Sequence, residues 1–457
     1  MVVSRTRGGG WSLAVIAVSS ALVLAACGDD DATSPGSTRL TTAATAAATT
    51  PDPVAPTHGP APTTIAPGPT AMLLPAPTGD LDTGTVILHL RDEARPDPLG
   101  TSGAPRELMA QLWYPAEATD EPRAPYAPPG EAAALQAFYP VPAGAFTATT
   151  NSALGAPAVE GDHPVVFFYH GLCASRTDST IVAEQLASDG YVVVALASTG
   201  ESLGVQFPDG TVVSTTDPAS CTVGADPYSP EGKAVVERLL GVRVDDVTFT
   251  LAELERLADG ENPDADGAEL PDGLADTMDL STLGIYGHSF GGSTAAAVMA
   301  ADDRFAAGVD LDGLLAGPVA TAGLDRPFLL VGSSYHDATF DPSWATFIPA
   351  LTGWHRWITV QHAGHYRFID LGGSVRHWGL DTSLKPADPV TWEQIFGDVD
   401  DAASVAINRD LVGGFFDQFL NDEPAAIFDD PAAAHPELVD QPGVEVTLSP
   451  TPPTTPG

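Results

Sequence analysis

The stretch from residue 280 to residue 301 constrains the fold of this chain more than any other. Leu280–Tyr286 has the length and the residue types of a strand, and Gly291–Ala301 consists mostly of small residues, as in a closely packed helix. Between the two lies Gly287-His288-Ser289-Phe290-Gly291, a G-x-S-x-G pattern. Glycines that flank a serine allow a strand to turn sharply into a helix with the serine at the turn. The pattern therefore predicts a strand, a tight turn at Ser289 and a helix.

Strand patterns alternate with helical patterns from about residue 85 to residue 420. Several strand runs are apolar throughout, as expected where helices cover both faces of a sheet. The alternation predicts a mostly parallel central sheet with helices on both faces. Together with the turn at Ser289, it predicts an α/β chain of the α/β-hydrolase fold. The expected strands are Thr85–Leu90, Glu107–Tyr114, Pro164–Tyr169, Tyr191–Ala197, Leu280–Tyr286, Phe305–Leu311, Pro327–Val331 and Trp357–Gln361, and the expected helices are Asp178–Ser188, Glu231–Leu257, Gly291–Ala301 and Asp401–Leu420.

The N-terminal segment predicts export and lipid anchoring. Arg5 and Arg7 precede an apolar segment, Trp11–Leu24, which is short for a transmembrane helix. The segment ends in Leu24-Ala25-Ala26-Cys27, which resembles the lipobox of bacterial lipoproteins. We therefore expect residues 1–27 to be a lipoprotein signal peptide. Lipidation at Cys27 would hold the exported chain on the outer face of a bacterial membrane.

Composition separates a central domain from two flexible ends. Residues 28–80 are rich in Thr, Ala and Pro and poor in large apolar side chains, which predicts a disordered tether. Residues 439–457 predict a disordered tail, which leaves 81–438 for the α/β-hydrolase domain. An exported chain meets an oxidising compartment. Cys173 and Cys221 form an even pair within the domain, so we expect one disulfide between them.

Charge and motif content exclude several classes of partner and cofactor. The chain carries 60 acidic and 19 basic residues, a formal net charge of −41. Such a surface repels phosphate backbones, which excludes a nucleic-acid-binding role. The sequence has no H-E-x-x-H, C-x-x-C, P-loop or dinucleotide-binding pattern. His362 and His365 have the spacing of two metal ligands, but no further ligands complete a site, so no metal and no cofactor are predicted.

The turn at Ser289 predicts a nucleophilic hydroxyl, because it exposes the side chain at the carboxyl ends of the strands. A serine that attacks an acyl group needs backbone N–H donors for the oxyanion. One donor is expected from Phe290, the residue after the serine. The other is expected from Leu172, in the loop after the strand Pro164–Tyr169. The side chain of His170, in the same loop, is expected to pack or hydrogen-bond there.

A serine hydroxyl also needs a base, and the base needs a carboxylate that orients it. In this fold the chain order is serine, acid, histidine. His365 follows the last predicted strand and is the expected base, with His362 as its main competitor. The acid is open between Asp310 and Asp312, at the end of one strand, and Asp337, after the next strand.

These motifs resemble the secreted, or plasma-type, family of platelet-activating factor acetylhydrolases and its bacterial relatives. The similar segments, within roughly residues 80–425, are Phe167–Leu172, Gly287–Gly292, Asp303–Phe305, Gly308–Gly313, Gly364–Asp370 and Ser404–Asn408. The resemblance implies Asp312 as the acid. The chain departs from the family after Tyr191–Ala197, where the family often has an acidic residue and a histidine and this chain has Ser198-Thr199-Gly200. A weaker resemblance, to cutinase-like bacterial lipases that degrade polyesters, implies Asp337 as the acid.

We therefore expect a serine carboxylic ester hydrolase that acts on a small ester or lipid through an acyl-enzyme. The family resemblance implies short-acyl esters, including phospholipids that resemble platelet-activating factor. The alternatives are a broad lipase or cutinase-like esterase, and a non-catalytic surface lipoprotein that keeps the fold. Relatives that lose activity commonly lose the serine or the histidine, whereas this chain has both Ser289 and His365.

Overall fold

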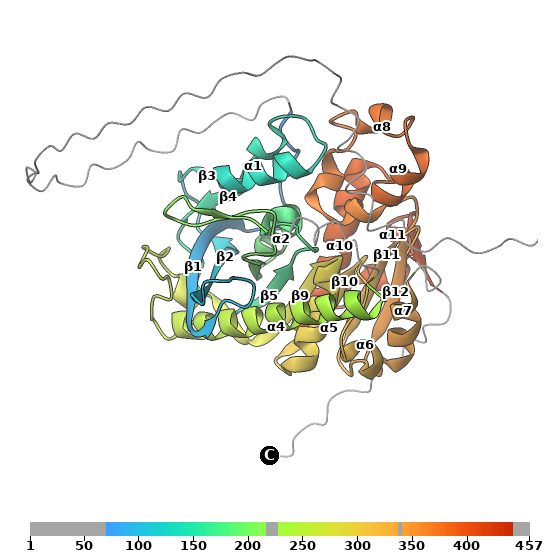
Figure 1. Ribbon diagram of the computed structural model, residues 1–457. Helices are drawn as coiled ribbons and strands as arrows, with labels where there is room; N and C mark the ends of the chain where they lie inside the picture. Colours follow the sequence, from blue (N-terminus) through green and yellow to red (C-terminus); the bar gives the residue numbers. More distant parts are fainter. Residues whose placement is uncertain (1–69, 216–226, 337–340, 442–457) are drawn as a thin grey trace, which may run out of the picture.

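The computed structural model describes residues 70–215, 227–336 and 341–441, which are drawn as coloured ribbons in Figure 1. Three candidate site residues, Cys27, Cys221 and Asp337, lie outside the described residues, as does the rest of the expected signal peptide. The same holds for residues 28–69 of the expected tether and residues 442–457 of the expected tail. The lipidation of Cys27 and the Cys173–Cys221 disulfide therefore stay predictions.

Within the described residues, eleven strands form one sheet. Strands β6, β5, β9, β10, β11 and β12 are parallel to their neighbours in this series, and antiparallel strands flank it on both sides. This mostly parallel sheet confirms the predicted fold class. In spatial order the strands are β13 (Leu438–Asp440), β12 (His355–Val360), β11 (Phe328–Ser333), β10 (Phe305–Leu311), β9 (Met278–His288), β5 (His163–Tyr169), β6 (Val192–Ala197), β2 (Pro105–Ala116), β1 (Asp82–Pro96), β4 (Thr149–Leu154) and β3 (Arg123–Pro125).

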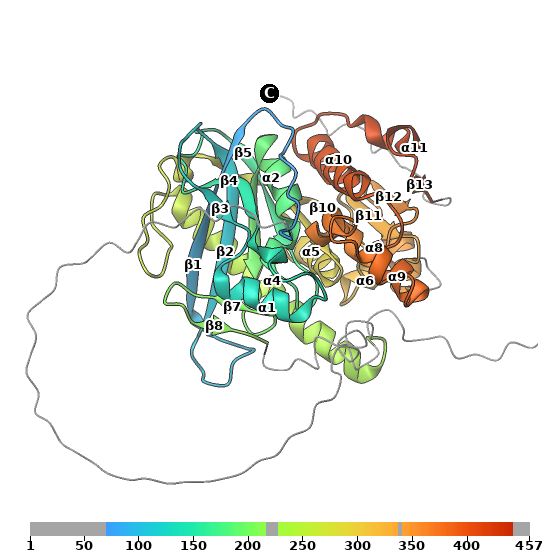
Figure 2. The same ribbon diagram turned by 90° about the horizontal axis from the view of Figure 1, so that it is seen from above.

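Helices cover both faces of the sheet (Figures 1 and 2). Helices α2 (Thr180–Ser188) and α10 (Asp401–Leu420) pack on one face, and α4 (Pro230–Ala258) and α5 (Phe290–Ala301) pack on the other. The shorter elements are α1 (Pro129–Phe138), α6 (Val319–Ala322), α7 (Pro342–Phe347), α8 (Leu380–Ser383), α9 (Pro389–Ile395), α11 (Pro431–Ala434) and the hairpin of β7 (Val205–Gln206) and β8 (Val212–Val213). In the part of the chain that the structure describes, no helix combines the length and the apolar character needed to cross a membrane.

The two faces explain why β5 is apolar from Val165 to Phe168. Val165 and Phe167 contribute to the core under α4 and α5, whereas Val166 and Phe168 contribute to the core under α2 and α10. Successive side chains of a strand point to opposite faces, so a strand covered on both sides has no position left for a polar residue.

The parallel strands place the segments of interest at one edge of the sheet. A polar residue directly follows each of the strands β5, β9, β10 and β11, and these residues are His170, Ser289, Asp312 and Ser334 in that order. His365 follows the end of β12 after a short loop. In open α/β sheets the carboxyl ends of neighbouring parallel strands line a common crevice. Residues far apart in sequence therefore meet there.

Residues 70–80, which we assigned to the tether, belong to the ordered domain. Ala71 and Met72 are buried, and the Leu73 N–H donates to Ser374 Oγ at 2.8 Å. Arg409 on α10 donates to the carbonyl of Pro75 at 2.7 Å. The predicted boundary at residue 80 is therefore too late, because main-chain hydrogen bonds to distant residues order a segment whose composition alone predicts disorder.

Candidate active site

Ser289 occupies the sharp turn between β9 and α5 that the sequence predicted. Its backbone has a φ of 57° and a ψ of −123°, a strained conformation for a residue other than glycine. A Cβ on Gly287 would lie 2.1 Å from the carbonyl of Gly291. A Cβ on Gly291 would lie 1.9 Å from the carbonyl oxygen of Tyr169 on β5. Both glycines are therefore required by packing, and Ser289 itself stays partly exposed.

The loop after β5 lies directly against Ser289. A Cβ on Gly171 would lie 3.2 Å from the Cβ of Ser289. Phe290 is the first residue of α5, and the first N–H groups of a helix have no intrahelical acceptor. The N–H of Phe290 is therefore available to a negative charge beside Ser289, which the helix dipole also favours. The structure brings together the two segments, around Leu172 and Phe290, from which the sequence predicted oxyanion donors.

His365 and Asp312 are hydrogen-bonded to each other across 53 residues of sequence. Nδ1 of His365 lies 2.6 Å from Oδ2 of Asp312. The Asp312 carboxylate is shielded from water, whereas the His365 side chain is 24% exposed. Because Nδ1 donates to the carboxylate, Nε2 is left as the acceptor of a hydroxyl proton. This is the tautomer that a serine nucleophile requires of its base.

Asp312 is held in an ionised state. Its φ is 59°, and its Oδ1 accepts the N–H of Ser333 at 2.6 Å. Nδ1 of His336 lies 3.2 Å from the same oxygen. Burial alone would raise the pKa of Asp312, but the hydrogen bonds and charges of His336 and His365 hold it well below its usual range. The carboxylate therefore keeps its negative charge at neutral pH.

Asp310, the alternative at the end of β10, has a different environment. Its Oδ1 accepts the N–H of Gly313 at 2.9 Å. A Cβ on Gly292 would lie 1.7 Å from the same oxygen, so the carboxyl packs under the first turn of α5. Burial raises the pKa of Asp310 well above its usual range, which favours the neutral form of this carboxyl. Asp337, the other alternative, lies outside the described residues.

His362 and His365, the pair with ligand-like spacing, differ in their surroundings. His362 is exposed, with a φ of 63°, and its carbonyl accepts the N–H groups of Asp398 and Val399 at 2.6 and 3.0 Å. His365 instead donates to Asp312. Across the residues that the structure describes, no group of three or more His, Cys, Asp or Glu side chains is arranged to hold a metal ion.

Comparison with known proteins identifies the family. The family model for platelet-activating factor acetylhydrolase, isoform II, matches residues 132–378 of the 457 in this chain. The chain belongs to this family. The matched segment contains Leu172, Ser289, Asp312 and His365, so the residues assembled above all lie within it.

Individual relatives support the same assignment. A probable 1-alkyl-2-acetylglycerophosphocholine esterase of Arthroderma benhamiae is 25% identical over 399 residues, which are 81% of this chain and 94% of the relative. A platelet-activating factor acetylhydrolase of Cavia porcellus is 25% identical over 215 residues, 46% of this chain and 48% of that protein. A solved structure, the ferulic acid esterase from Streptomyces cinnamoneus, matches with a TM-score of 0.67 and 32% identity over 82% of this chain and 99% of that chain. The chain is therefore an enzyme of the serine hydrolase class that hydrolyses carboxylic esters.

No feature of the sequence assigned a role to His288. In this member of the acetylhydrolase family, its side chain supports the segment that carries His365. Its buried Nε2 lies 2.9 Å from the carbonyl oxygen of His365, and the two ring centres are 4.5 Å apart. Burial, together with the nearby His365, lowers the pKa of His288 to about 3, so the ring is neutral and donates from Nε2. This hydrogen bond fixes the backbone at His365 relative to the turn at Ser289. A histidine at a variable position of G-x-S-x-G gives no such signal in the sequence.

The side chain of His170 is buried and hydrogen-bonds at the loop after β5, as we expected. Nδ1 lies 2.7 Å from the carbonyl of Gly171, and Nε2 accepts from the hydroxyl of Ser202 at 3.0 Å and from the N–H of Ser198 at 3.3 Å. Burial and the charge of Arg243 lower the pKa of His170 to about 4, so the ring is neutral. The segment after β6 that departs from the family pattern thus supports the loop after β5. We call this loop, which contains His170, Gly171 and Leu172, the oxyanion loop.

Arg243 on α4 is a further residue that sequence reasoning missed. Its buried guanidinium donates to the carbonyls of His170 at 2.8 Å and Gly171 at 3.2 Å. It is also paired with Glu201, to which Nε donates at 3.0 Å. Its Cζ lies 4.4 Å from the ring centre of Phe290. One arginine therefore holds both segments that are expected to supply oxyanion donors, while its own charge is balanced by a buried carboxylate.

Arg243→Lys is expected to lower kcat about 10- to 100-fold with a smaller change in KM. Lysine keeps the charge but cannot reproduce the planar fork that joins Glu201 to two carbonyls, and one misplaced oxyanion donor costs up to about three powers of ten. The control is Arg326→Lys, because Arg326 also donates to main-chain carbonyls, but these lie at the end of α5 far from Ser289. Both variants should melt at lower temperature. A wild-type kcat in folded Arg243→Lys would show that Arg243 does not hold the loop.

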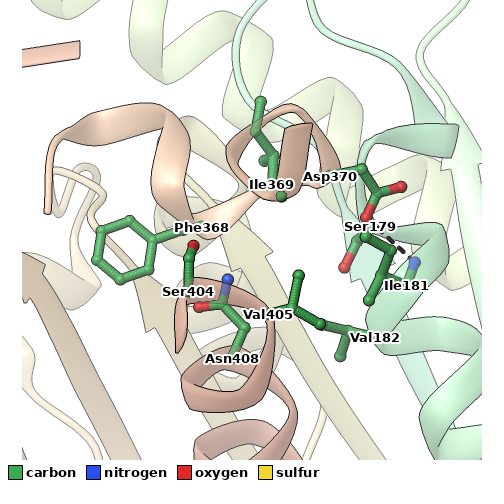
Figure 3. Close-up of a pocket in the computed structure, with 10 residues that line it drawn as sticks. Ser179, Ile181, Val182, Phe368, Ile369, Asp370, Ser404, Val405 and Asn408 are labelled. Carbon is green, nitrogen blue, oxygen red and sulfur yellow. Dashed lines mark hydrogen bonds between the residues drawn. The ribbon is translucent and has the colours of Figure 1, made fainter. Parts of the chain in front are cut away.

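A small cavity lies behind the histidine segment, between α2, α10 and residues 368–373 (Figure 3). Its volume of about 10 Å³ is close to the minimum for one water molecule, so it does not admit a substrate. The carboxylate of Asp370 at its edge accepts the N–H groups of Thr180 at 2.8 Å and Ile181 at 3.1 Å. Asp370 therefore caps α2 and ties the segment after His365 to that helix.

Proposed function

We propose that this chain hydrolyses carboxylic esters through an acyl-enzyme formed on Ser289. His365 takes the proton from Oγ of Ser289 as the oxygen attacks the ester carbonyl, and Asp312 orients and stabilises the imidazolium that forms. The N–H groups of Leu172 and Phe290 stabilise the oxyanion. His365 then returns the proton to the leaving alcohol. Water, activated by the same histidine, releases the acid and regenerates the serine.

The observation that carries this proposal is the 2.6 Å hydrogen bond between Asp312 and His365, beside the strained turn at Ser289. If His365 served only to fill space in the core, its imidazole would not be partly exposed and hydrogen-bonded to the buried, ionised carboxylate of Asp312. Both Ser289 and Asp312 also adopt positive φ values without being glycines. Backbone strain of this kind gathers at functional sites, where the surrounding structure compensates for it. These features favour an enzyme over a non-catalytic lipoprotein that keeps the fold.

We further propose that the substrate is a short-acyl ester and, within that class, a phospholipid that resembles platelet-activating factor. The family and the Arthroderma benhamiae relative, a probable 1-alkyl-2-acetylglycerophosphocholine esterase, support this class. An apolar cluster beside the oxyanion segments, which includes Leu172, Leu239 and Phe290, supports an apolar acyl group.

A second candidate substrate is an ester with an aromatic acyl group. The ferulic acid esterase from Streptomyces cinnamoneus shares 32% identity with this chain, and the match covers 99% of that enzyme. The chain also has Ser198-Thr199-Gly200 where the acetylhydrolase family often has an acidic residue and a histidine. This departure lies next to the oxyanion loop and supports a changed pocket.

The two substrate proposals are separated by kcat/KM measured on p-nitrophenyl esters of graded chain length, an acetyl phosphocholine ether lipid and methyl ferulate. We expect the acetyl esters to be hydrolysed fastest and activity to fall with acyl length. A preference for methyl ferulate would overturn the phospholipid proposal and leave the mechanism intact. Equal rates across all chain lengths would favour a broad lipase or cutinase-like esterase. Failure to hydrolyse any ester would contradict the proposed function.

We also propose that the chain is lipid-anchored through Cys27 on the outer face of a bacterial membrane. Cys27→Ala should move the protein from the membrane fraction to the soluble exported fraction, because several acyl chains on one terminus give stable attachment. Cell fractionation and mass spectrometry of the mature N-terminus measure this directly. Ser37→Ala, in the expected tether, is the control and should remain in the membrane fraction. An unmodified N-terminus on mature wild-type protein would refute the anchor.

A further inference from the structure

Asp312 has a second imidazole partner that the proposed triad does not use. His336, which follows β11, lies with Nδ1 3.2 Å from Oδ1 of Asp312 and with Nε2 3.0 Å from Oδ2 of Asp341. The three side chains are no more than 6% exposed. The ring of His336 stacks on Trp344 of α7 with 4.0 Å between ring centres. A buried row of Asp341, His336 and Asp312 therefore ends at His365.

The geometry of this row fixes the protonation of His336. Both ring nitrogens face carboxylates, and an ionised carboxylate can only accept hydrogen bonds. A ring that donates from both nitrogens is an imidazolium. Burial alone would lower the pKa of His336, but its hydrogen bonds to Asp312 and Asp341 raise it to about 10. The hydrogen bond and charge of His336 lower the pKa of Asp341 in turn, despite its burial.

The elements packed around His336 supply the other groups that influence it. At the end of β10 the chain presents Asp310, and Asp312 follows directly; burial raises the pKa of Asp310 well above the usual range, which favours its neutral form. At the start of α7, Asp341 accepts the hydroxyl of Tyr228 at 2.6 Å and the N–H of Ser343 at 2.8 Å. These two bonds fix Asp341, and Asp341 in turn fixes the far side of the His336 ring.

We propose that His336 is a positioning residue for the triad, a buried imidazolium anchored by Asp341 that aims Asp312 at His365 and sets the pH at which His365 becomes a base. This inference rests on the proposed triad. With His336 charged, the row carries two negative charges and one positive charge. Its net negative charge balances the imidazolium that forms on His365 during the reaction. The sequence offered no signal for this role, because His336 stands beside an apolar strand with no motif around it.

Two substitutions change the charge of the row by different amounts. Loss of the positive charge of His336 leaves two carboxylates near His365, which favours protonated His365, so that the base forms only at higher pH. Asp341→Asn removes one negative charge, but its amide nitrogen then donates to Nε2 of His336, and the ring becomes neutral. The row keeps one negative charge, as in the wild type, so the second shift should be much smaller than the first. A residue that served packing alone would not shift the pH profile.

The test is the pH profile of kcat/KM on p-nitrophenyl acetate for the full chain and its variants. His336→Asn keeps an uncharged donor near Asp312, and we expect kcat to fall about 10- to 100-fold with KM little changed. The acid limb of its profile should move up by on the order of one pH unit. Asp341→Asn keeps the oxygen that caps α7 and accepts from Tyr228, and its acid limb should move by much less than that of His336→Asn. If His336→Asn does not fold, Asp341→Asn still decides, because loss of the anchor of His336 should lower kcat with KM little changed.

The matched control is His89→Asn on β1. His89 is also buried, with Nδ1 2.9 Å from Asp266 and Nε2 3.5 Å from Glu107, but it lies several strands away from the site. It should alter stability without moving the acid limb. A wild-type profile in folded His336→Asn, or a wild-type kcat in folded Asp341→Asn, would overturn the inference. Failure of the triad itself would be distinct, because Asp312→Asn would then keep the wild-type rate.

Discussion

Ser289→Ala is expected to lower kcat on p-nitrophenyl acetate by about five to six powers of ten. The alanine removes the oxygen that attacks the ester, whereas the oxyanion donors and the substrate pocket remain. Some rate above the uncatalysed reaction should therefore persist. The melting temperature should change little, because alanine meets the same backbone strain at φ 57° as serine does. Steady-state kinetics and thermal unfolding on the same preparation give both quantities.

Ser281→Ala provides the control for this substitution. Ser281 lies on the same strand, β9, but it is exposed, and its hydroxyl bonds to Asp279. Its loss should leave kcat and KM unchanged. A Ser289→Ala variant that keeps more than about a tenth of the wild-type rate would contradict the assignment of Ser289 as the nucleophile.

Asp312→Asn is expected to lower kcat by about four powers of ten while the protein stays folded. The carboxylate holds His365 with Nδ1 as donor, and an amide in its place lets the imidazole take the wrong tautomer. The substitution also removes one of the two carboxylates that flank His336. We therefore expect a lower melting temperature as well. Kinetics and circular dichroism together separate lost catalysis from lost structure.

Asp310→Asn is the matched control, because Asp310 is buried two residues earlier and its burial favours the neutral form. Its amide oxygen can still accept the N–H of Gly313, so kcat should fall little. Asp337→Asn should also be mild. A folded but inactive Asp337→Asn beside an active Asp312→Asn would reverse the assignment and favour the cutinase-like reading of the site.

Periodicity and turn chemistry predicted the elements that carry the site. The predicted range Phe305–Leu311 coincides with β10 and the range Asp401–Leu420 with α10, because long apolar patterns and clear termini leave few alternatives. The short helices α7, α8 and α9 were not predicted, since four to seven residues give no measurable period. Residues 70–80 were assigned to the tether because hydrogen bonds to Ser374 and Arg409 cannot be read from local composition.

The proposed triad could be assembled from the sequence only in part. Ser289 follows from its glycines, and His365 follows from its place after β12. The choice between Asp310 and Asp312 could not come from strand alternation, which would point both side chains the same way. In the structure β10 ends at Leu311, and the backbone of Asp312 turns to a φ of 59°, which separates the two carboxyls.

The supporting residues escaped detection for another reason. His288, His336 and Arg243 act through contacts with residues 77, 24 and 73 positions away in the chain. None of them stands in a pattern with a mechanism attached. Their roles depend on burial and on the atoms they face, which only the folded chain determines. A buried arginine or histidine is therefore found after the fold is known, not before it.

The most direct test of the proposed chemistry is to trap the acyl-enzyme. Wild-type protein mixed with p-nitrophenyl acetate and quenched in acid during turnover should carry one acetyl group per chain, which peptide mass spectrometry should locate on Ser289. A fluorophosphonate probe should label the same residue, and Ser289→Ala should take up neither group. Acetylation of a different residue, or full turnover in wild-type protein whose Ser289 is never acylated, would contradict the mechanism.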